Sequence, residues 1–391
     1  MIPKGWNVKP LGELVTARSG GTPSKNKLEY WGGAVNWFTA KDLKAPLLRE
    51  SELKLTELGA SVGAVVEPGT ILILTRGMGL LRDVPLGICE RRSAFNQDVK
   101  ALLARDGVHG LFLLYALEHS KHRLGGLVTT AGHGTCRLET DSLLGHSLLV
   151  PEPNEQAAIA DVLRNCDAVE ERIETLLSSK QRRRQALAQR LLTGQVRLPG
   201  FTRDWKSSEL GALFKERREA DREDLPLLAI TGHRGIVNRE ELAKRDTSCE
   251  DKRRYLRIAP GDIGYNTMRM WQGVCALSKL EGIVSPAYTI CTPRRGVSAE
   301  FMVQLFQLPA TVHLFHRHSQ GLVADTLNLK FKHFARIRLT VPTEVKEQQA
   351  IAAILNNADR EIALHRAELD ALKRQKRGLM QQLLTGKVRV P

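Results

Sequence analysis

Side chains that can read nucleic acid gather in two separate stretches of this chain. Arginine and lysine bind phosphates and guanine edges, and asparagine, glutamine, serine and threonine bond to base edges. Arg76 and Arg269 are favoured, because each follows a short β-like run at matching points of the two stretches. The candidates in the first stretch are Thr22, Lys25, Arg76, Arg91, Arg92, His133, Thr135 and Arg137. Those in the second are His233, Arg234, Arg253, Arg254, Tyr255, Asn266, Arg269, Arg317, His318 and Gln320.

No comparable pattern indicates metal binding or catalysis. His313, His316 and His318 are closely spaced but have no partner cluster, and the six cysteines show no CxxC spacing. Glu52-Leu53-Lys54 is an ExK triplet of the kind seen in nucleases, but no acidic partner is evident. The sequence has no GxxxxGK[ST] loop for ATP, no Asn-Pro-Pro-aromatic motif for adenine methylation and no FxGxG motif for a methyl donor. We therefore predict no catalytic residue, no metal and no cofactor.

The charge of the chain indicates a polyanionic partner. The formal net charge is +15, and most of the excess falls within residues 1–150 and 199–341. A basic protein need not bind nucleic acid, so charge alone leaves both interpretations open. No apolar run approaches the length of about 18 residues that a membrane span needs, and the first residues lack the apolar stretch of a signal peptide. We expect a cytoplasmic location and no membrane partner.

An internal repeat defines the elements that must position the candidate residues. Residues 155–199 align without a gap on residues 347–391, and the copies end in LLTGQVRLP and LLTGKVRVP. A fainter repeat precedes each copy, where VEPGTI answers IAPGDI. The sequence therefore predicts two diverged globular domains, 1–150 and 199–341, each followed by a constant helical segment, 151–198 and 342–391.

Both constant segments read as long helices. Asn154 and Thr343 are the expected N-caps, and Gly194 and Gly386 are the expected C-terminal stops. A 3.5-residue apolar seam predicts that the two helices pair as a coiled coil. The seam residues are Ile159, Leu163, Ile173, Leu177, Leu187, Leu191, Ile351, Leu355, Ile362, Leu369, Leu379 and Leu383. The basic run 180–184 fits a solvated or partner-facing stripe better than a DNA clamp.

Several phrases add a family resemblance to this frame. The first domain contains GGTPS (Gly20 to Ser24), EYWGGAVNWFTAKDL (Glu29 to Leu43), RGMG (Arg76 to Gly79) and FNQD (Phe95 to Asp98). The second contains YNTMRMWQG (Tyr265 to Gly273) and VSPAYTI (Val284 to Ile290). With the Glu-Gln and LLTG ends of the helical segments, the whole chain resembles the DNA-specificity (S) subunit of type I restriction-modification enzymes. Asn96 and Gln97 lie within such a phrase, which favours a role in the fold over a contact with DNA.

The resemblance implies both a fold and a function. The expected fold is mixed α/β: two target recognition domains with curved β-sheets, joined by two long antiparallel coiled-coil helices with pseudo-two-fold symmetry. Each domain would read one half of a bipartite site in double-stranded DNA. The helices would set the spacing and dock two methyltransferase subunits, to which motor-nuclease subunits add. Members of this family have no catalysis of their own.

Two alternatives stay open on the sequence alone. A recognition module from a related single-chain system would bind DNA without separate methyltransferase subunits. A structural coiled-coil adaptor would bind no DNA at all. Salt-dependent duplex binding separates the adaptor from the other two, and co-purification with a methyltransferase subunit separates the first two.

Overall fold

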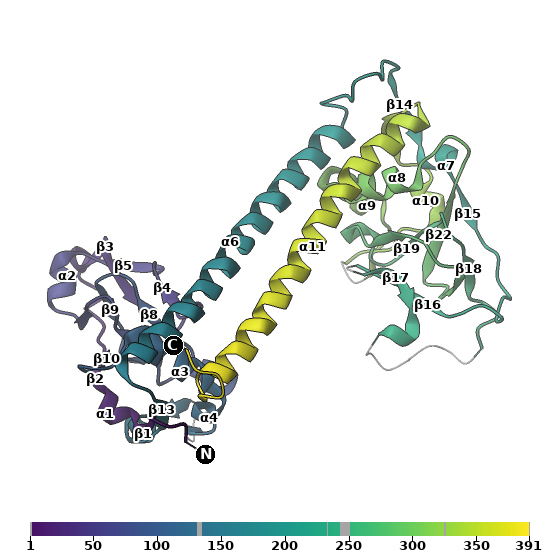
Figure 1. The fold of residues 1–391 in the computed structure, drawn as a ribbon. Helices are drawn as coiled ribbons and strands as arrows, with labels where there is room; N and C mark the ends of the chain where they lie inside the picture. Colours follow the sequence, from purple (N-terminus) through teal and green to yellow (C-terminus); the bar gives the residue numbers. More distant parts are fainter. Residues whose placement is uncertain (1, 131–134, 233, 243–250, 324–325, 391) are drawn as a thin grey trace. The chain divides into compact units, whose positions relative to one another are not determined.

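The chain forms two compact units, each of which contains part of both long helices. Unit 1 is Met1–Glu174 with Glu368–Pro391, and unit 2 is Thr175–Ala367. The division therefore crosses α6 (Pro153–Leu192) and α11 (Val345–Leu383), which are labelled in Figure 1. The computed structural model describes residues 2–130, 135–232, 234–242, 251–323 and 326–390.

Unit 1 is a mixed α/β body. Its strands are β1 (Asn7–Pro10), β2 (Val15–Ser19), β3 (Trp31–Phe38), β4 (Leu47–Leu48), β5 (Leu53–Leu55), β6 (Val65–Val66), β7 (Ile71–Leu74), β8 (Leu86–Cys89), β9 (Ser93–Phe95), β10 (Val99–Ala104), β11 (Val128–Thr130), β12 (Cys136–Leu138) and β13 (Ser147–Val150). Its shorter helices are α1 (Leu11–Leu14), α2 (Glu57–Ser61), α3 (Gly110–His119), α4 (Lys121–Gly125) and α5 (Thr140–Leu144), with 3-10 turns η1 (Leu28–Tyr30) and η2 (Met78–Leu81).

Two sheets make up most of unit 1. One has the order β2-β10-β7-β8-β4 and the other β5-β3-β9-β6. All four residues of β7 are buried, because this apolar run occupies the centre of its sheet. The first strand, β1, pairs antiparallel with β13, the strand that precedes α6. The start and the end of the first globular stretch are thereby joined at the base of the helix.

Unit 2 repeats this plan with fewer strands. Its strands are β14 (Trp205–Glu209), β15 (Phe214–Arg217), β16 (Leu228–Thr231), β17 (Gly235–Asn238), β18 (Leu256–Ile258), β19 (Ile263–Asn266), β20 (Cys275–Leu277), β21 (Gly282–Val284), β22 (Tyr288–Pro293) and β23 (Arg338–Pro342). Its shorter helices are α7 (Leu210–Leu213), α8 (Ala299–Phe306), α9 (Pro309–His318) and α10 (Phe331–Phe334), with 3-10 turns η3 (Arg239–Glu241) and η4 (Met270–Gln272).

The two units share the order of their central strands. The order β15-β22-β19-β20 in unit 2 matches β2-β10-β7-β8 in unit 1, and the pair β14–β23 matches β1–β13. In each unit a 3-10 turn, η2 or η4, follows the corresponding strand, β7 or β19. The faint sequence repeat therefore reflects a repeated fold, and the expected mixed α/β architecture is confirmed.

The Glu-Gln pair at the start of each long helix ties that helix to its unit. In unit 2, Glu347 is 1% exposed and accepts hydrogen bonds from Arg197 Nε (2.7 Å) and Trp205 Nε1 (3.3 Å). In unit 1, Glu155 accepts them from Arg389 Nη2 (2.7 Å) and Trp6 Nε1 (3.1 Å). The arginine of each VRLP or VRVP end thus binds the glutamate of the other long helix.

The neighbouring glutamines make a second pair of equivalent contacts. Gln156 accepts from the His109 backbone N–H (2.9 Å) and donates to the Pro151 carbonyl (2.9 Å). Gln348 accepts from the Ser298 backbone N–H (2.8 Å) and donates to the Pro342 carbonyl (2.8 Å). Each amide therefore satisfies backbone groups around a buried helix start, which explains the repeated Glu-Gln.

The expected helix stops are confirmed, whereas the expected N-caps are wrong. Gly194 (φ 72°) and Gly386 (φ 66°) adopt the left-handed conformation that ends a helix. Asn154 lies inside α6, because Pro153 already fits the first helical position, where a missing N–H costs nothing. Thr343 precedes α11 by two residues, and its hydroxyl donates to the Asp204 carbonyl (3.1 Å).

Within each unit the two long helices run antiparallel and are joined by an equivalent ion pair. In unit 1, Asp167 of α6 binds Lys376 of α11 and accepts a 2.5 Å hydrogen bond from the Tyr115 hydroxyl. In unit 2, Asp359 of α11 binds Arg184 of α6 (2.8 Å), and Gln304 also donates to Asp359 (3.3 Å). The helix pair and the globular part of each unit thus meet at one carboxylate.

The predicted seam residues also enter the domain cores. The core of unit 1 includes Ile159, Leu163 and Leu383, and that of unit 2 includes Leu191, Ile351 and Leu355. Four others, Ile173, Leu177, Ile362 and Leu369, are buried at 7–9% exposure, while Leu187 and Leu379 are half-buried. The ends of the apolar seam therefore pack against sheets and short helices as well as against the other long helix.

Candidate nucleic-acid interface

The FNQD phrase forms the turn after β9 and divides its two amide side chains between core and surface. Asn96 is 8% exposed and donates to Asp98 Oδ2 (3.0 Å), whereas Gln97 is exposed and accepts a 2.7 Å hydrogen bond from the Thr22 hydroxyl. The GGTPS phrase packs backbone to backbone on this turn. A Cβ at Gly20 would lie 2.1 Å from the Asn96 carbonyl oxygen, so only glycine fits there.

A groove of about 560 Å³ opens beside this turn in unit 1. Its lining residues are Thr22, Lys25, Trp37, Thr39, Ala40, Lys41, Asp42, Glu52, Leu53, Asn96, Gln97 and Asp98. The structure thus brings together two sequence candidates, Thr22 and Lys25. Sequence reasoning missed Lys41, although its position in the phrase FTAKDL was a usable signal.

A second group of candidates lies on the loop after β7. The backbone N–H of Arg76 donates to the Asp98 carbonyl (3.2 Å), which connects this loop to the turn beside the groove. Arg76 also forms a β-bridge with Arg137, which ion-pairs with Glu139 (3.0 Å). The side chain of Arg76 is exposed and has no partner among the described residues. Thr135 is exposed beside this loop, and His133 lies outside the described residues.

Arg91 and Arg92 are set apart from these groups. They precede β9, whereas Asn96 and Gln97 follow it, so they lie at the opposite end of that strand. Both are ion-paired, Arg91 with Glu50 (3.1 Å) and Arg92 with Glu57 (2.8 Å). The structure therefore does not bring these two arginines to the edge that holds Gln97.

The equivalent loop of unit 2 gathers its own candidates. Asn266 at the end of β19 accepts from the Met268 backbone N–H (2.9 Å), and the exposed Arg269 has no side-chain partner among the described residues. Helix α9 packs on η4, with the Trp271 and His316 rings 5.8 Å apart. This packing brings three further candidates beside Arg269: exposed Arg317, half-buried His318 and exposed Gln320.

The remaining unit 2 candidates do not join this loop. Arg234 is ion-paired with Glu241 (3.1 Å), and Arg253 with Asp251 (2.8 Å), which lowers the pKa of Asp251 to about 2. Arg254 is exposed. Tyr255 is 6% exposed, so its ring belongs to the interior and cannot contact a duplex without unfolding its neighbours. His233 lies outside the described residues.

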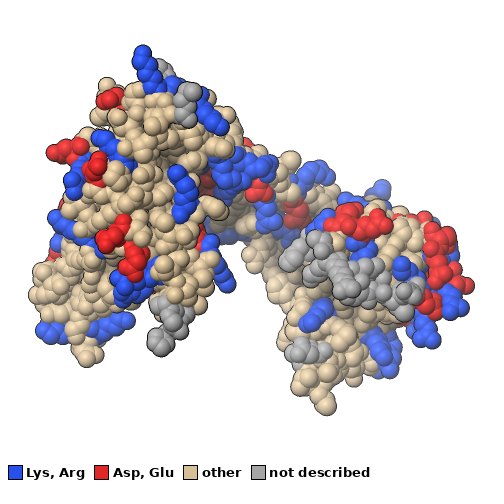
Figure 2. Space-filling view, turned by 90° about the horizontal axis from the view of Figure 1, so that it is seen from below, with Lys and Arg blue, Asp and Glu red and all other residues tan. Residues whose placement is uncertain are grey.

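Both signs of charge occur on the face seen in Figure 2. Lys and Arg side chains are scattered over that face among Asp and Glu side chains and do not form one continuous basic patch there. An arginine already bonded to a carboxylate must leave that partner before it can bind an anion. Lys25, Lys41, Arg76, Arg269 and Arg317 are exposed and have no ion-pair partner among the described residues, so they are well placed to meet DNA.

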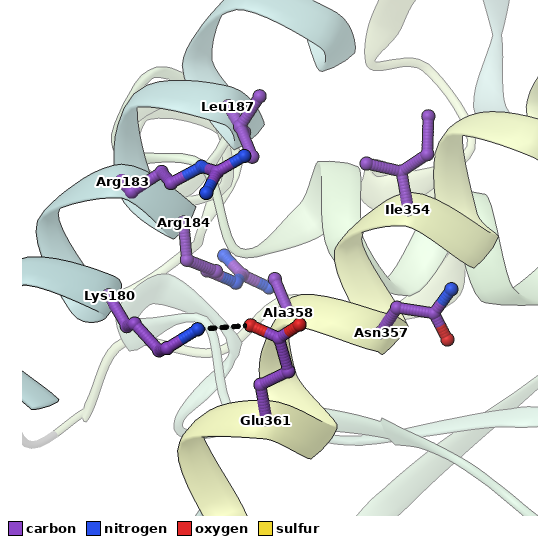
Figure 3. Close-up of a pocket in the computed structure, with 8 residues that line it drawn as sticks. All are labelled: Lys180, Arg183, Arg184, Leu187, Ile354, Asn357, Ala358 and Glu361. Carbon is purple, nitrogen blue, oxygen red and sulfur yellow. Dashed lines mark hydrogen bonds and ion pairs between the residues drawn. The ribbon is translucent and has the colours of Figure 1, made fainter.

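A separate groove of about 150 Å³ lies between the long helices within unit 2. Figure 3 shows Lys180, Arg183 and Leu187 of α6 facing Ile354, Asn357 and Glu361 of α11 across this groove. Lys180 and Glu361 form a 2.7 Å ion pair, and Ile354 is 36% exposed. The basic stripe 180–184 is therefore partly held by carboxylates of α11 and rims a small, partly apolar groove.

Two other features can be checked over the described residues. Among them, no group of three or more His, Cys, Asp and Glu side chains is arranged to hold a metal ion. None of the helices that the structure describes has an apolar stretch sufficient to span a bilayer.

Comparison with known proteins identifies similar sequences over part of the chain. Residues 3–179 match the family profile described as type I restriction modification DNA specificity domain. The EcoR124I/EcoR124II specificity subunit of Escherichia coli is 27% identical over 164 residues. The MjaIX specificity subunit of Methanocaldococcus jannaschii is 30% identical over 175 residues. These matches span 41% and 39% of the length of the two relatives.

Solved structures match the fold over the whole chain. The S subunit of a type I restriction-modification system from M. genitalium aligns with a TM-score of 0.63, covering 98% of this chain and 99% of its own, at 14% identity. A chain from a study of complex assembly and conformational transition in the type I system aligns with a TM-score of 0.55 at 15% identity, covering 99% of this chain and 100% of its own. At such identities the likeness establishes the shared fold.

Proposed function

We propose that this chain is a specificity subunit of a type I restriction-modification system and selects the DNA sequence on which such a complex acts; the family match over residues 3–179 and the two similar specificity subunits support this proposal. Residues 1–150 and 199–341 are the two target recognition domains in this proposal. Each domain reads one half of a bipartite site in double-stranded DNA. The segments 151–198 and 342–391 set the spacing between the half-sites.

One observation carries this proposal. Two units with the same central strand order each present an exposed arginine on the loop after the matching strand, Arg76 after β7 and Arg269 after β19, and neither side chain has a partner among the described residues. Each loop lies beside a second segment with polar side chains, Thr135 to Arg137 in unit 1 and Arg317 to Gln320 in unit 2. A guanidinium on a surface loop can bond a guanine edge with two parallel donors.

The helical segments supply the surface for protein partners in this proposal. Two methyltransferase subunits dock on them, and motor-nuclease subunits join the full complex. The groove of unit 2 in Figure 3 supports such docking, because it combines the exposed Ile354 with the basic rim of Lys180 and Arg183. The chain itself contributes recognition without catalysis, in the cytoplasm, and uses no cofactor.

Mutation of the two loop arginines tests base reading directly. Arg76→Ala and Arg269→Ala should each relax discrimination at one base position by about 1–3 kcal/mol and leave the other half-site unchanged. Arg82→Ala is a matched control, because Arg82 is exposed near the end of the same unit 1 loop and was not identified as a reader. The measurement is competition binding of the assembled complex against a library of duplexes. An Arg76→Ala variant with unchanged base preference would remove this residue from the reading role.

A further inference from the structure

The loops that carry Arg76 and Arg269 each carry an exposed methionine as well. Met78 lies two residues after Arg76 and is 61% exposed, and Met268 directly precedes Arg269 and is 46% exposed. Because consecutive Cα atoms are about 3.8 Å apart, the backbone of each methionine lies within about 7 Å of that of its arginine. Each loop therefore offers a charged hydrogen-bond donor and an apolar side chain next to one another.

Neither methionine is used to anchor its loop in the domain core. Leu80 and Met270 have that role, at 3% and 0% exposure, and belong to the cores of unit 1 and unit 2. A single exposed apolar side chain is ordinary on a protein surface. An exposed methionine on the same loop of both units, beside an arginine in each, instead indicates a surface that becomes covered when the loop binds its ligand.

Hydrogen bonds fix the backbone on both sides of Met268. Its N–H donates to Asn266 Oδ1 (2.9 Å), and its carbonyl accepts from Trp271 Nε1 (3.0 Å). The carbonyl of the preceding Thr267 accepts from the Leu329 N–H (2.8 Å). The side chain of Met268 is therefore presented from a constrained turn, which lowers the entropy lost when it makes a contact.

The loop of unit 1 is fixed in an equivalent way. The Thr75 carbonyl accepts from the Leu138 N–H (2.9 Å), which matches the bond to Thr267 in unit 2. Met78 then begins the 3-10 turn η2, in which side chains three residues apart lie on one face. Leu81 is three residues further on and is also 61% exposed, so it extends the apolar surface of Met78.

The order of arginine and methionine differs between the two loops. Counted from the matching threonine, unit 1 has its arginine first and its methionine third, whereas unit 2 has its methionine first and its arginine second. The two loops thus present the same pair of chemical groups in different arrangements. Such loops are suited to different base sequences.

We infer that Met78 and Met268 each contact the C5-methyl group of a thymine in the major groove. The inference rests on the proposed function and adds an apolar contact to the arginine contact of each loop. Among the bases only thymine presents a methyl group in this groove, where an arginine also bonds guanine. Since the duplex rises about 3.4 Å per base pair, each thymine should lie within about two base pairs of the pair that its arginine reads.

Deoxyuridine substitution tests the inference, because deoxyuridine differs from thymidine only by the missing methyl group. The assembled complex is titrated with duplexes of the preferred site in which one thymine at a time, on either strand, is replaced. In each half-site one replacement should weaken binding about fourfold. The slope of log affinity against log salt should stay unchanged, because no charge is removed.

Methionine variants then assign the contact to a residue. Met78→Ala should abolish the deoxyuridine effect in one half-site only, and Met268→Ala should abolish it in the other half-site only. Leu58→Ala and Leu364→Ala are the matched controls, since these leucines are 53% and 65% exposed on α2 and α11, away from the two loops. Both controls should keep the fourfold effect in both half-sites.

Three outcomes would overturn the inference. They are full affinity for every deoxyuridine duplex, a deoxyuridine effect that survives in the methionine variants, and a deoxyuridine effect that the control variants also lose. A methionine-dependent rise in the fluorescence of 2-aminopurine placed beside the thymine would show a side chain inserted between base pairs and would also overturn it. If the unmodified complex binds the preferred and a scrambled duplex equally well, the proposed function fails instead, so the two failures are distinguishable.

Discussion

Replacing Lys376 with methionine should loosen unit 1 where its long helices meet. Lys376 and Asp167 form an ion pair whose side chains are only 14% and 11% exposed. Lys376→Met keeps the aliphatic length but leaves the Asp167 carboxylate with the Tyr115 hydroxyl as its remaining partner. Breaking a buried pair costs roughly 3–5 kcal/mol, and the retained hydrogen bond places our expectation at the lower end, about 3 kcal/mol.

Lys373→Met provides the matched control for this prediction. Lys373 lies on the same helix and pairs with Glu174 at 2.7 Å, but these side chains are 39% and 52% exposed. Exposed pairs are screened by water, so this variant should cost less than about 0.5 kcal/mol. Asp167→Asn combined with Lys376→Met removes both charges and should recover much of the loss.

Hydrogen-exchange mass spectrometry of the full chain gives the readout, because it reports opening of the helix segments 153–174 and 368–383 separately from unit 2. Faster exchange should appear in both segments of Lys376→Met and in neither segment of Lys373→Met. Equal protection from hydrogen exchange in the two variants would show that the Asp167–Lys376 pair does not stabilise the contact between the long helices in unit 1.

Three other perturbations follow from the structure. Burial, together with the charge of Arg123, lowers the pKa of His119 and of His146, so these groups contribute stability that is present above about pH 6.5 and lost as the pH falls. The free energy of unfolding of unit 1 should therefore decrease as the pH falls below about 6.5, and His146→Gln should flatten that pH dependence in denaturant titrations; an identical pH dependence would contradict the assignment. Gly194→Ala and Gly386→Ala should each cost about 1 kcal/mol in thermal or chemical unfolding, because both glycines are left-handed. Gly386→Ala should destabilise the protein more than Gly194→Ala. A Cβ at Gly386 would lie 2.4 Å from Pro3 Cγ, whereas one at Gly194 would lie 3.4 Å from the Trp205 ring. A larger loss of stability for Gly194→Ala would contradict this packing. Inserting four residues after Ala186 lengthens α6 by about one turn. If helix length sets the spacing, the preferred spacer between the half-sites should lengthen by about one or two base pairs, with both half-site sequences unchanged. Mapping of methylated sites measures the spacer, and an active variant that keeps the original spacer would refute the prediction.

The repeated features of the fold were predictable because they recur in the sequence. The helix stops at Gly194 and Gly386 and the repeated Glu-Gln starts all mark real ends of α6 and α11. The N-caps were not predictable, because the residue that favours a cap near each start does not lie at the position where the backbone begins the helix. Pro153 starts α6 ahead of Asn154, and the Thr343 hydroxyl is used by another segment.

The candidate interface was only partly predictable, because the availability of an arginine depends on partners far away in sequence. Arg91 and Arg92 are neutralised by Glu50 and Glu57, which lie 41 and 35 residues earlier. The adjacent Asn96 and Gln97 differ in exposure because successive side chains leave the turn after β9 in different directions, so that Asn96 is buried and Gln97 is exposed. Phrase matching alone assigned both to the fold.

The central claim is that each unit reads one half of a bipartite DNA site. The most direct test replaces residues 1–150 with the first domain of another specificity subunit, assembles the chimaera with its methyltransferase subunits and maps methylated sites across a genome. The account predicts that one half of the recognised sequence changes while the other half is retained. A change of both halves together, or an active chimaera with the original sequence, would contradict it.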